Sequence, residues 1–246
     1  EKLRDSFFFG SVFGYAYKVD WDRKSTSVIG VRGPLTARAM GLDPKDSVIG
    51  DPAIYAVEMP EFKHGNTLTN SRRVVCLHHR TCELWNFQAK NSSQLYFLDP
   101  GMSSLQDYIA TIREAEIVYA ESLHGAIVAA TLGVPWIPVW IREPLESVKW
   151  ADFFELMKYK HFEPIRLEAP PSSFVRRLAI SSKARHLFEP SHLGRIVYEE
   201  HILNIQNTLY KEHPSSFLRT DKTLISSLQE KIHEAIGKLQ KVQEIQ

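Results

Sequence analysis

Two short segments of the sequence combine a side chain that can handle an anion or a proton with an adjacent glycine. The first is VRGP, residues 31–34, and the second is SLHG, residues 122–125. Arg32 can form a two-pronged ion pair with a carboxylate or a phosphate. His124 can act as a general acid or base, because an imidazole group exchanges a proton near neutral pH. In each segment we expect the glycine to let a ligand approach the backbone closely.

Further polar side chains in the sequence suit the same chemistry. Asp51 follows a short apolar run, and a His-His-Arg run ending at Arg80 follows a longer one. His79 and Arg80 would add positive charge, although a surface loop is an equally good interpretation. Asp51 could contact a substrate or form a turn, and Ser122 could cap a helix. Taken singly, Arg32 and His124 also have an ordinary structural explanation, as a surface arginine and a core histidine.

The elements that must position these residues alternate between strands and helices. Apolar runs predict strands over residues 7–9, 27–32, 47–50, 73–78, 94–98, 117–120 and 134–140. Capping signals and apolar spacing predict helices over residues 34–40, 104–115, 125–132, 147–159, 193–210 and 223–242. This alternation indicates an α/β protein with a mostly parallel sheet. Ligands bind such sheets at the carboxyl ends of the strands, where helix N-termini converge. All the polar segments described above lie at such predicted strand ends.

A polar segment over residues 60–71 divides the chain into two α/β parts. We expect residues 1–66 to form the remainder of an N-terminal α/β domain and residues 67–190 a C-terminal α/β domain. Residues 191–246 are expected to form a helical tail. Apolar residues at helical spacing in the tail favour packing on the body of the protein or on another subunit, so an oligomer through the C-terminal helix is one expectation.

The composition narrows the class of protein. The 246 residues are 43% hydrophobic and 24% charged, as in an ordinary globular protein, and the net charge of +1 argues against a nucleic-acid-binding surface. We find no run of 18 apolar residues that would predict a membrane span, and no recognisable signal peptide. Cys76 and Cys82 lack the spacing of metal ligands and are expected to be free thiols in a reducing compartment.

The order of several short blocks resembles the polysaccharide pyruvyl transferase family. The blocks are VRGPLTARAMG, GDPAIYA, the strand ending at His79, ESLHGAIVAATLGVPWIPV and VKWADFF, within residues 9–154. Each block is short, but their ordered combination is specific. The resemblance implies two Rossmann-like domains in a GT-B-like arrangement with the ligand cleft between them. Because the family's Asn-x-Gly-Asp motif is absent, we expect the N-terminal domain to be incomplete and to lack its first βα unit.

The family transfers pyruvate from phosphoenolpyruvate to two hydroxyls of a sugar, which gives a cyclic ketal and free phosphate. The resemblance implies that Arg32 helps to hold phosphoenolpyruvate and that His124 is the main catalytic group, flanked at the site by Leu123 and Gly125. It implies phosphoenolpyruvate as donor with no further cofactor and no metal. The acceptor would be a polysaccharide or a lipid-linked oligosaccharide, in the cytoplasm, with peripheral association at the inner face of the cell membrane allowed.

One position departs from the family's pattern. Glu121-Ser122 precedes the Leu-His-Gly block, where relatives often have Ser-Ser or Ser-Arg. If an arginine there binds phosphoenolpyruvate in some members, Ser122 cannot supply its charge, and Arg80 or Lys149 is the candidate replacement. Glu121 would then face the sugar or be buried in a pair.

Two other functions stay open. A glycosyltransferase that uses a nucleotide sugar on the same scaffold would need a base- and ribose-binding pocket, for which we find no clear motif. A non-catalytic protein of polysaccharide assembly would fit the missing Asn-x-Gly-Asp segment, whereas Arg32 and His124 argue against it. Phosphate release from phosphoenolpyruvate would separate the transferase from both.

Overall fold

The computed structural model describes residues 6–11, 26–70, 72–77, 95–101, 103–140, 147–159, 164–167, 208–209 and 217–243. Three residues discussed above, His79, Arg80 and Cys82, lie outside these ranges. The predicted helix over residues 193–210 also lies almost entirely outside them.

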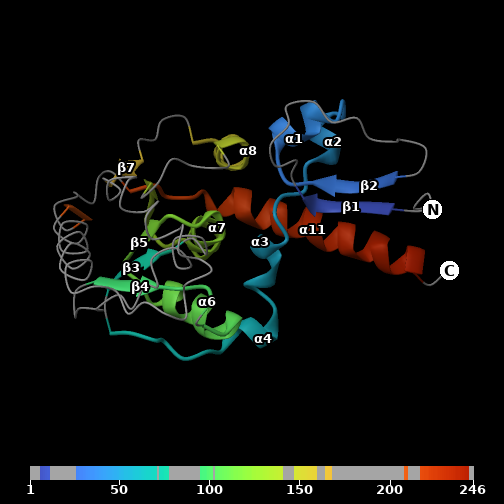
Figure 1. Ribbon diagram of the computed structural model, residues 1–246. Coiled ribbons are helices and arrows are strands. Elements are labelled where there is room, and N and C mark those ends of the chain that lie inside the picture. Colours follow the sequence, from blue (N-terminus) through green and yellow to red (C-terminus); the bar gives the residue numbers. More distant parts are fainter. Residues whose placement is uncertain are drawn as a thin grey trace, which may run out of the picture.

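A five-stranded parallel sheet is the centre of the larger lobe (Figure 1). Its strands are β3 (Arg73–Cys76), β4 (Leu95–Leu98), β5 (Ile117–Ala120), β6 (Trp136–Trp140) and β7 (Ile165–Arg166). Every neighbouring pair in the order β4-β3-β5-β6-β7 is parallel, which confirms the predicted mostly parallel sheet. All four residues of β5 are buried, as expected for a strand covered on both faces.

Three helices pack with the larger sheet, and the sequence explains where they begin. They are α6 (Leu105–Arg113), α7 (Leu123–Leu132) and α8 (Ser147–Leu156). Ser104 caps α6 by accepting a hydrogen bond from the Asp107 backbone N–H. α7 ends at Gly133, whose φ of 72° is the left-handed conformation that favours glycine.

The smaller lobe is built on two parallel strands, β1 (Ser6–Ser11) and β2 (Thr26–Val31). Four short helices follow: α1 (Pro34–Ala39), α2 (Pro44–Ser47), α3 (Ala53–Ala56) and α4 (Pro60–Lys63). The strand predicted over residues 47–50 is wrong, because α2 includes Ser47 and only Val48 pairs, in a parallel bridge with Val31. The polar segment over residues 60–71, for which no helix is predicted, begins with the helix α4.

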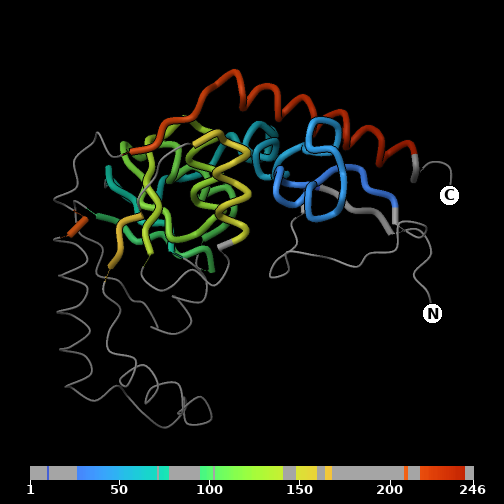
Figure 2. Tube along the Cα trace, turned by 90° about the horizontal axis from the view of Figure 1, so that it is seen from above, coloured from blue at the N-terminus to red at the C-terminus, as the bar shows by residue number. Residues whose placement is uncertain are grey.

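A long helix, α11 (Lys222–Gln243), connects the two lobes (Figures 1 and 2). It follows a bridge between Leu218 and Trp136 of β6 and then contacts α3 and β2 in the smaller lobe. Gln229 Nε2 donates to the Ile54 carbonyl at 3.2 Å. The predicted C-terminal helix is confirmed, and in the structure it packs on the chain's own body.

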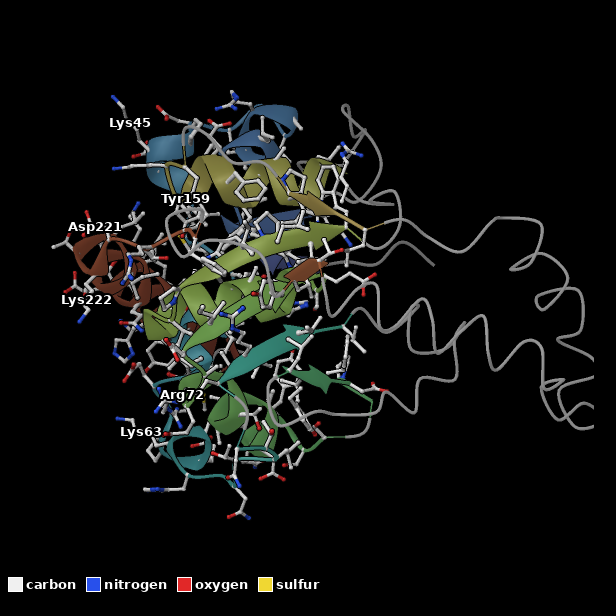
Figure 3. All side chains as sticks on the ribbon, turned by 90° about the vertical axis from the view of Figure 1, so that its left-hand side faces the viewer. Lys45, Lys63, Arg72, Tyr159, Asp221 and Lys222 are labelled. Carbon is white, nitrogen blue, oxygen red and sulfur yellow. The ribbon has the colours of Figure 1, made fainter. Side chains whose placement is uncertain are left out.

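The start of α11 is fastened to the end of α8. The Tyr159 hydroxyl lies 2.6 Å from Oγ1 of Thr220. Figure 3 shows Tyr159 between α8 and the first residues of α11, near Asp221 and Lys222. Tyr159 also packs edge-on against Trp136, which is fully buried among the aromatic residues of α8.

One continuous hydrophobic cluster extends through both lobes. It joins buried residues of the smaller lobe, such as Val31 and Ile54, to those on one face of the larger sheet, such as Val118 and Trp136. A second cluster covers the opposite face of that sheet. The structure confirms the α/β class, whereas the domain boundaries and the GT-B-like pair of Rossmann-like domains stay predictions. No helix within the described ranges is long and apolar enough to span a membrane.

Candidate functional site

The order of the strands marks a position at which an open parallel sheet can hold a ligand. The chain goes from β3 to β4 on one side and then returns past β3 to β5 on the other. The crevice between the carboxyl ends of two such strands is the usual ligand position in doubly wound sheets. The Cys76 carbonyl at the end of β3 accepts hydrogen bonds from the backbone N–H groups of Glu121 and Ser122, both at 3.0 Å. The turn after β5 is therefore fixed directly beside the end of β3.

This turn leads into the N-terminus of α7, which carries His124. Ser122 is the N-cap, and its Oγ accepts a long hydrogen bond of 3.5 Å from the Gly125 N–H, as the sequence suggested. Within the described ranges, the backbone N–H groups of Leu123 and His124 have no acceptor, as is usual in a first helical turn. The His124 side chain is exposed, whereas that of Leu123 is buried. The histidine is thus accessible, and Leu123 anchors the helix in the core.

Gly125 has a packing role that differs from the expected one. A Cβ at this position would lie 2.5 Å from the Cβ of Cys76 and 3.2 Å from the Tyr108 hydroxyl. The glycine therefore lets α7 approach β3, and its open side faces protein instead of a ligand.

Cys76, the neighbour of Gly125, is a buried free thiol. Burial raises its pKa to about 12, while a hydrogen bond from the Tyr108 hydroxyl acts in the opposite direction. The thiol is consequently neutral at physiological pH and acts as a small core residue.

Arg32 and Asp51 come together in the smaller lobe. Arg32 follows β2, and Asp51 follows the segment whose Val48 bridges to Val31, so both lie at one edge. Arg32 Nε and Asp51 Oδ2 form an ion pair of 2.7 Å, with the side chains 11% and 4% exposed. Asp51 Oδ1 also accepts from the Ala53 N–H at 2.9 Å. Asp51 is thus the ion-pair partner of Arg32. This pairing could not be predicted from either sequence segment by itself.

A residue that the sequence analysis did not single out, Asp152 of α8, occupies the N-terminus of α1. Its Oδ1 accepts from the backbone N–H groups of Leu35 (2.7 Å) and Thr36 (3.3 Å). Its Oδ2 accepts from the Thr36 hydroxyl at 2.6 Å. A Cβ on Gly33 would collide with Asp152 Oδ1, so this glycine makes room for a protein carboxylate. The N-terminus of α1 is therefore not open to an anionic ligand, contrary to what the VRGP segment suggested.

Asp152 is fully buried, and this position affects its acidity. Burial raises the pKa of its carboxyl, while hydrogen bonds from Thr36 and Leu35 and the positive charge of Arg32 lower it. Only the glycine at the helix start, which has no side chain for capping, hints at Asp152 in the sequence.

The remaining predicted site residues lie close to these groups in the chain. Lys149 is on α8, one turn before Asp152, and is half-buried. Glu121 is 9% exposed. Of the two expectations for this residue, facing the sugar or being buried in a pair, the burial agrees with the second. Within the described part of the chain, no three His, Cys, Asp or Glu side chains are grouped as a metal site requires.

Comparison with known proteins identifies the family of this chain. The family model for polysaccharide pyruvyl transferase matches residues 6–143, which is more than half of the chain. The chain therefore belongs to the polysaccharide pyruvyl transferase family. It is similar to the succinoglycan biosynthesis protein ExoV of Rhizobium meliloti (strain 1021), with 34% identity over 149 residues. That alignment covers 60% of this chain and 46% of the relative, so the chain matches about half the length of that protein.

Proposed function

We propose that the protein is a ketal pyruvyltransferase of exopolysaccharide biosynthesis. It would transfer pyruvate from phosphoenolpyruvate to two hydroxyls of one sugar in a polysaccharide or its lipid-linked precursor. Two findings support the reaction class and the pathway: membership of the pyruvyl transferase family, and similarity to a protein named for succinoglycan biosynthesis. The observation that carries the proposal at the level of residues is the accessible His124 on the first turn of α7, beside the switch point of a parallel sheet.

We infer that the donor's anionic groups are held by Arg32 and by the first turn of α7. The ion pair with Asp51 engages the Nε side of the guanidinium group, which leaves its other N–H donors for a carboxylate or phosphate. The backbone N–H groups of Leu123 and His124 add donors at the positive end of a helix. Lys149, His79 and Arg80 are further candidates for binding phosphate.

The proposed chemistry has two steps, and each releases a proton from a sugar hydroxyl. In the first, a hydroxyl oxygen attacks the carbon of phosphoenolpyruvate that carries the phosphate, and the adjacent methylene takes up a proton to become a methyl group. In the second, the other hydroxyl attacks the same carbon, and phosphate leaves with the electron pair of its C–O bond and takes up the second proton. His124 would shuttle these protons, because an imidazole group can both accept and donate near neutral pH.

The experiment that tests this role compares three proteins: the wild type, His124→Ala and His64→Ala. His64 is an exposed histidine in the segment after α4 and serves as the matched control. With phosphoenolpyruvate and oligosaccharide precursor from cells lacking the gene, we expect phosphate release to fall about 10²–10⁴-fold in His124→Ala only. Release at the wild-type rate in His124→Ala would remove the histidine from the mechanism. No release by the wild type would instead favour a glycosyltransferase or a non-catalytic protein.

A further inference from the structure

The first turn of α1 is capped from another part of the chain. An N-cap residue normally supplies a side-chain oxygen to the N–H groups of the first turn, and the N-cap here, Gly33, has none. Pro34 at the first helical position has no N–H to satisfy. The N–H groups of Leu35 and Thr36 bind the Asp152 carboxylate, which comes from α8 in the larger lobe, 116–117 residues away in sequence.

We propose that Asp152 is a positioning residue for Arg32, an inference that rests on the function proposed above. Arg32 is joined directly to Gly33, against whose Cα the carboxylate packs. Asp152 thereby fixes the backbone just after Arg32, while Asp51 fixes its guanidinium group. One buried carboxylate, Asp51, thus contacts the guanidinium group of Arg32, and the other, Asp152, contacts the backbone that follows it.

This arrangement sets where Arg32 lies relative to the larger lobe. α8 and α7 both pack on one face of the five-stranded sheet. A contact from α8 to the Arg32 segment therefore fixes the position of Arg32 relative to the lobe that carries His124. A charge-assisted hydrogen bond needs short and aligned contacts, so a displaced Arg32 would bind an anion less tightly. Loss of Asp152 should therefore weaken donor binding beyond what a general loss of stability would do.

The same interface supplies a matched control. Glu155, one turn after Asp152 on α8, forms a two-pronged pair with Arg38 of α1, at 2.8 and 2.6 Å. This pair also links α1 to α8, but it is exposed and lies at the far end of α1 from Arg32. A change at Glu155 perturbs the contact between the helices without touching the Arg32 segment.

The test measures the dissociation constant of phosphoenolpyruvate by titration calorimetry for full-length wild type, Asp152→Ala, Asp152→Asn and Glu155→Ala. We expect Asp152→Ala to weaken binding about tenfold or more, and Glu155→Ala to stay within about twofold of the wild type. Asp152→Asn should recover much of the loss, because an amide oxygen can still accept from Leu35 and its NH₂ can donate to the Thr36 hydroxyl. A core variant on the opposite face of the larger sheet, such as Ile137→Ala, destabilises the protein away from Arg32 and Asp152 and should bind as the wild type does.

Equal binding by the wild type and Asp152→Ala would overturn the inference. If the wild type itself does not bind phosphoenolpyruvate, the proposed function fails, and amide hydrogen exchange without ligand decides about Asp152. Faster exchange at Leu35 and Thr36 in Asp152→Ala, with no change in Glu155→Ala, would then support the holding of the Arg32 segment. Unchanged exchange at both amides would overturn it.

Discussion

Gly125 stands next to the candidate catalytic histidine, yet its side facing the core is what requires a glycine. A Cβ there would collide with Cys76 of β3, whereas a Cβ on Gly237 of α11 would meet, among the described residues, no atom within 4 Å beyond its own stretch of helix. We expect Gly125→Ala to lower the free energy of unfolding by about 1–3 kcal/mol through overpacking. Gly237→Ala should raise it by about 0.5–1 kcal/mol, because alanine loses less conformational entropy in a helix.

Urea denaturation of the two glycine variants provides the comparison. Overpacking predicts opposite signs for Gly125→Ala and Gly237→Ala. If Gly125→Ala kept full stability and lost only activity, the glycine would serve a ligand, as the sequence first suggested, and the packing explanation would be wrong.

The burial of Asp152 should make the stability of the protein depend on pH. Burial raises the pKa of its carboxyl in the folded protein above the value in the unfolded chain, so the folded state binds its proton more tightly. As the pH rises from about 4 towards neutrality, the unfolded chain releases this proton first, and the free energy of unfolding contributed by Asp152 falls. We expect the stability of the wild type relative to Asp152→Asn to be greater at about pH 4 than at about pH 7.

The measurement is a pair of denaturation curves at each pH for these two proteins. Arg32, Asp51, Arg38 and Glu155 surround the site in both of them, so most of their own titration cancels in the difference. A difference that stays constant or grows with pH would show that hydrogen bonding to Leu35 and Thr36 outweighs burial.

At the scale of elements, α11 makes the most specific stability prediction. Ile232 is fully buried near Gly50 of the smaller lobe, and Ile236, one turn further on, is half-buried. We expect Ile232→Ala to cost about 2–5 kcal/mol and Ile236→Ala clearly less.

Because the apolar face of α11 packs on the chain's own body, the loss in Ile232→Ala should not depend on protein concentration. Thermal unfolding at two widely separated concentrations measures this. A loss that appears only at high concentration would indicate that the helix packs on a second subunit instead.

The elements that the sequence predicted best were those with purely local signals. The strand over residues 117–120 was predicted with the bounds that β5 has, and the start of α6 followed from Ser104. The apolar run over residues 48–49 predicts a strand, but Asp43 as N-cap and Pro44 at the first position start a short helix just before it, and only Val48 pairs. Contacts between distant elements leave little local signal; for Asp152 with α1 it is only the missing side-chain cap at Gly33.

The candidate site shows the same division. Arg32 and His124 could be selected because each comes after a strand, and strand ends share one edge; Asp51 was selected from a strand that the structure replaces with the single bridge of Val48. Arg32 and Asp51 can pair because the bridge from Val31 to Val48 brings their segments side by side. The sequence does not show which residues of two segments will lie opposite each other, so this pair could not be predicted. The sequence suggests that Gly33 and Gly125 leave space for a ligand, but it does not show that Asp152 and Cys76 already occupy that space.

At the scale of the whole molecule, the two lobes share one hydrophobic cluster, and contacts between helices tie them, among them α1 with α8, α3 with α7, α4 with α6, and α11 with α3. Arg32 directly follows β2 and His124 lies on α7, and these two elements belong to different lobes (Figure 1). In the proposed reaction, the donor would bridge the lobes, with its anionic end at the arginine and its reacting carbon near the histidine. The interface that fixes the lobes would then also fix the distance between these two groups.

The central claim is that this protein adds a pyruvate ketal to a polysaccharide. The most direct measurement is the mass of the oligosaccharide repeat unit from cells that carry the gene, cells that lack it, and cells complemented with His124→Ala. We expect the repeat unit from the first to be heavier by one pyruvic acid less one water, and the other two to match each other at the lower mass. Equal masses in cells with and without the gene would contradict the proposed reaction.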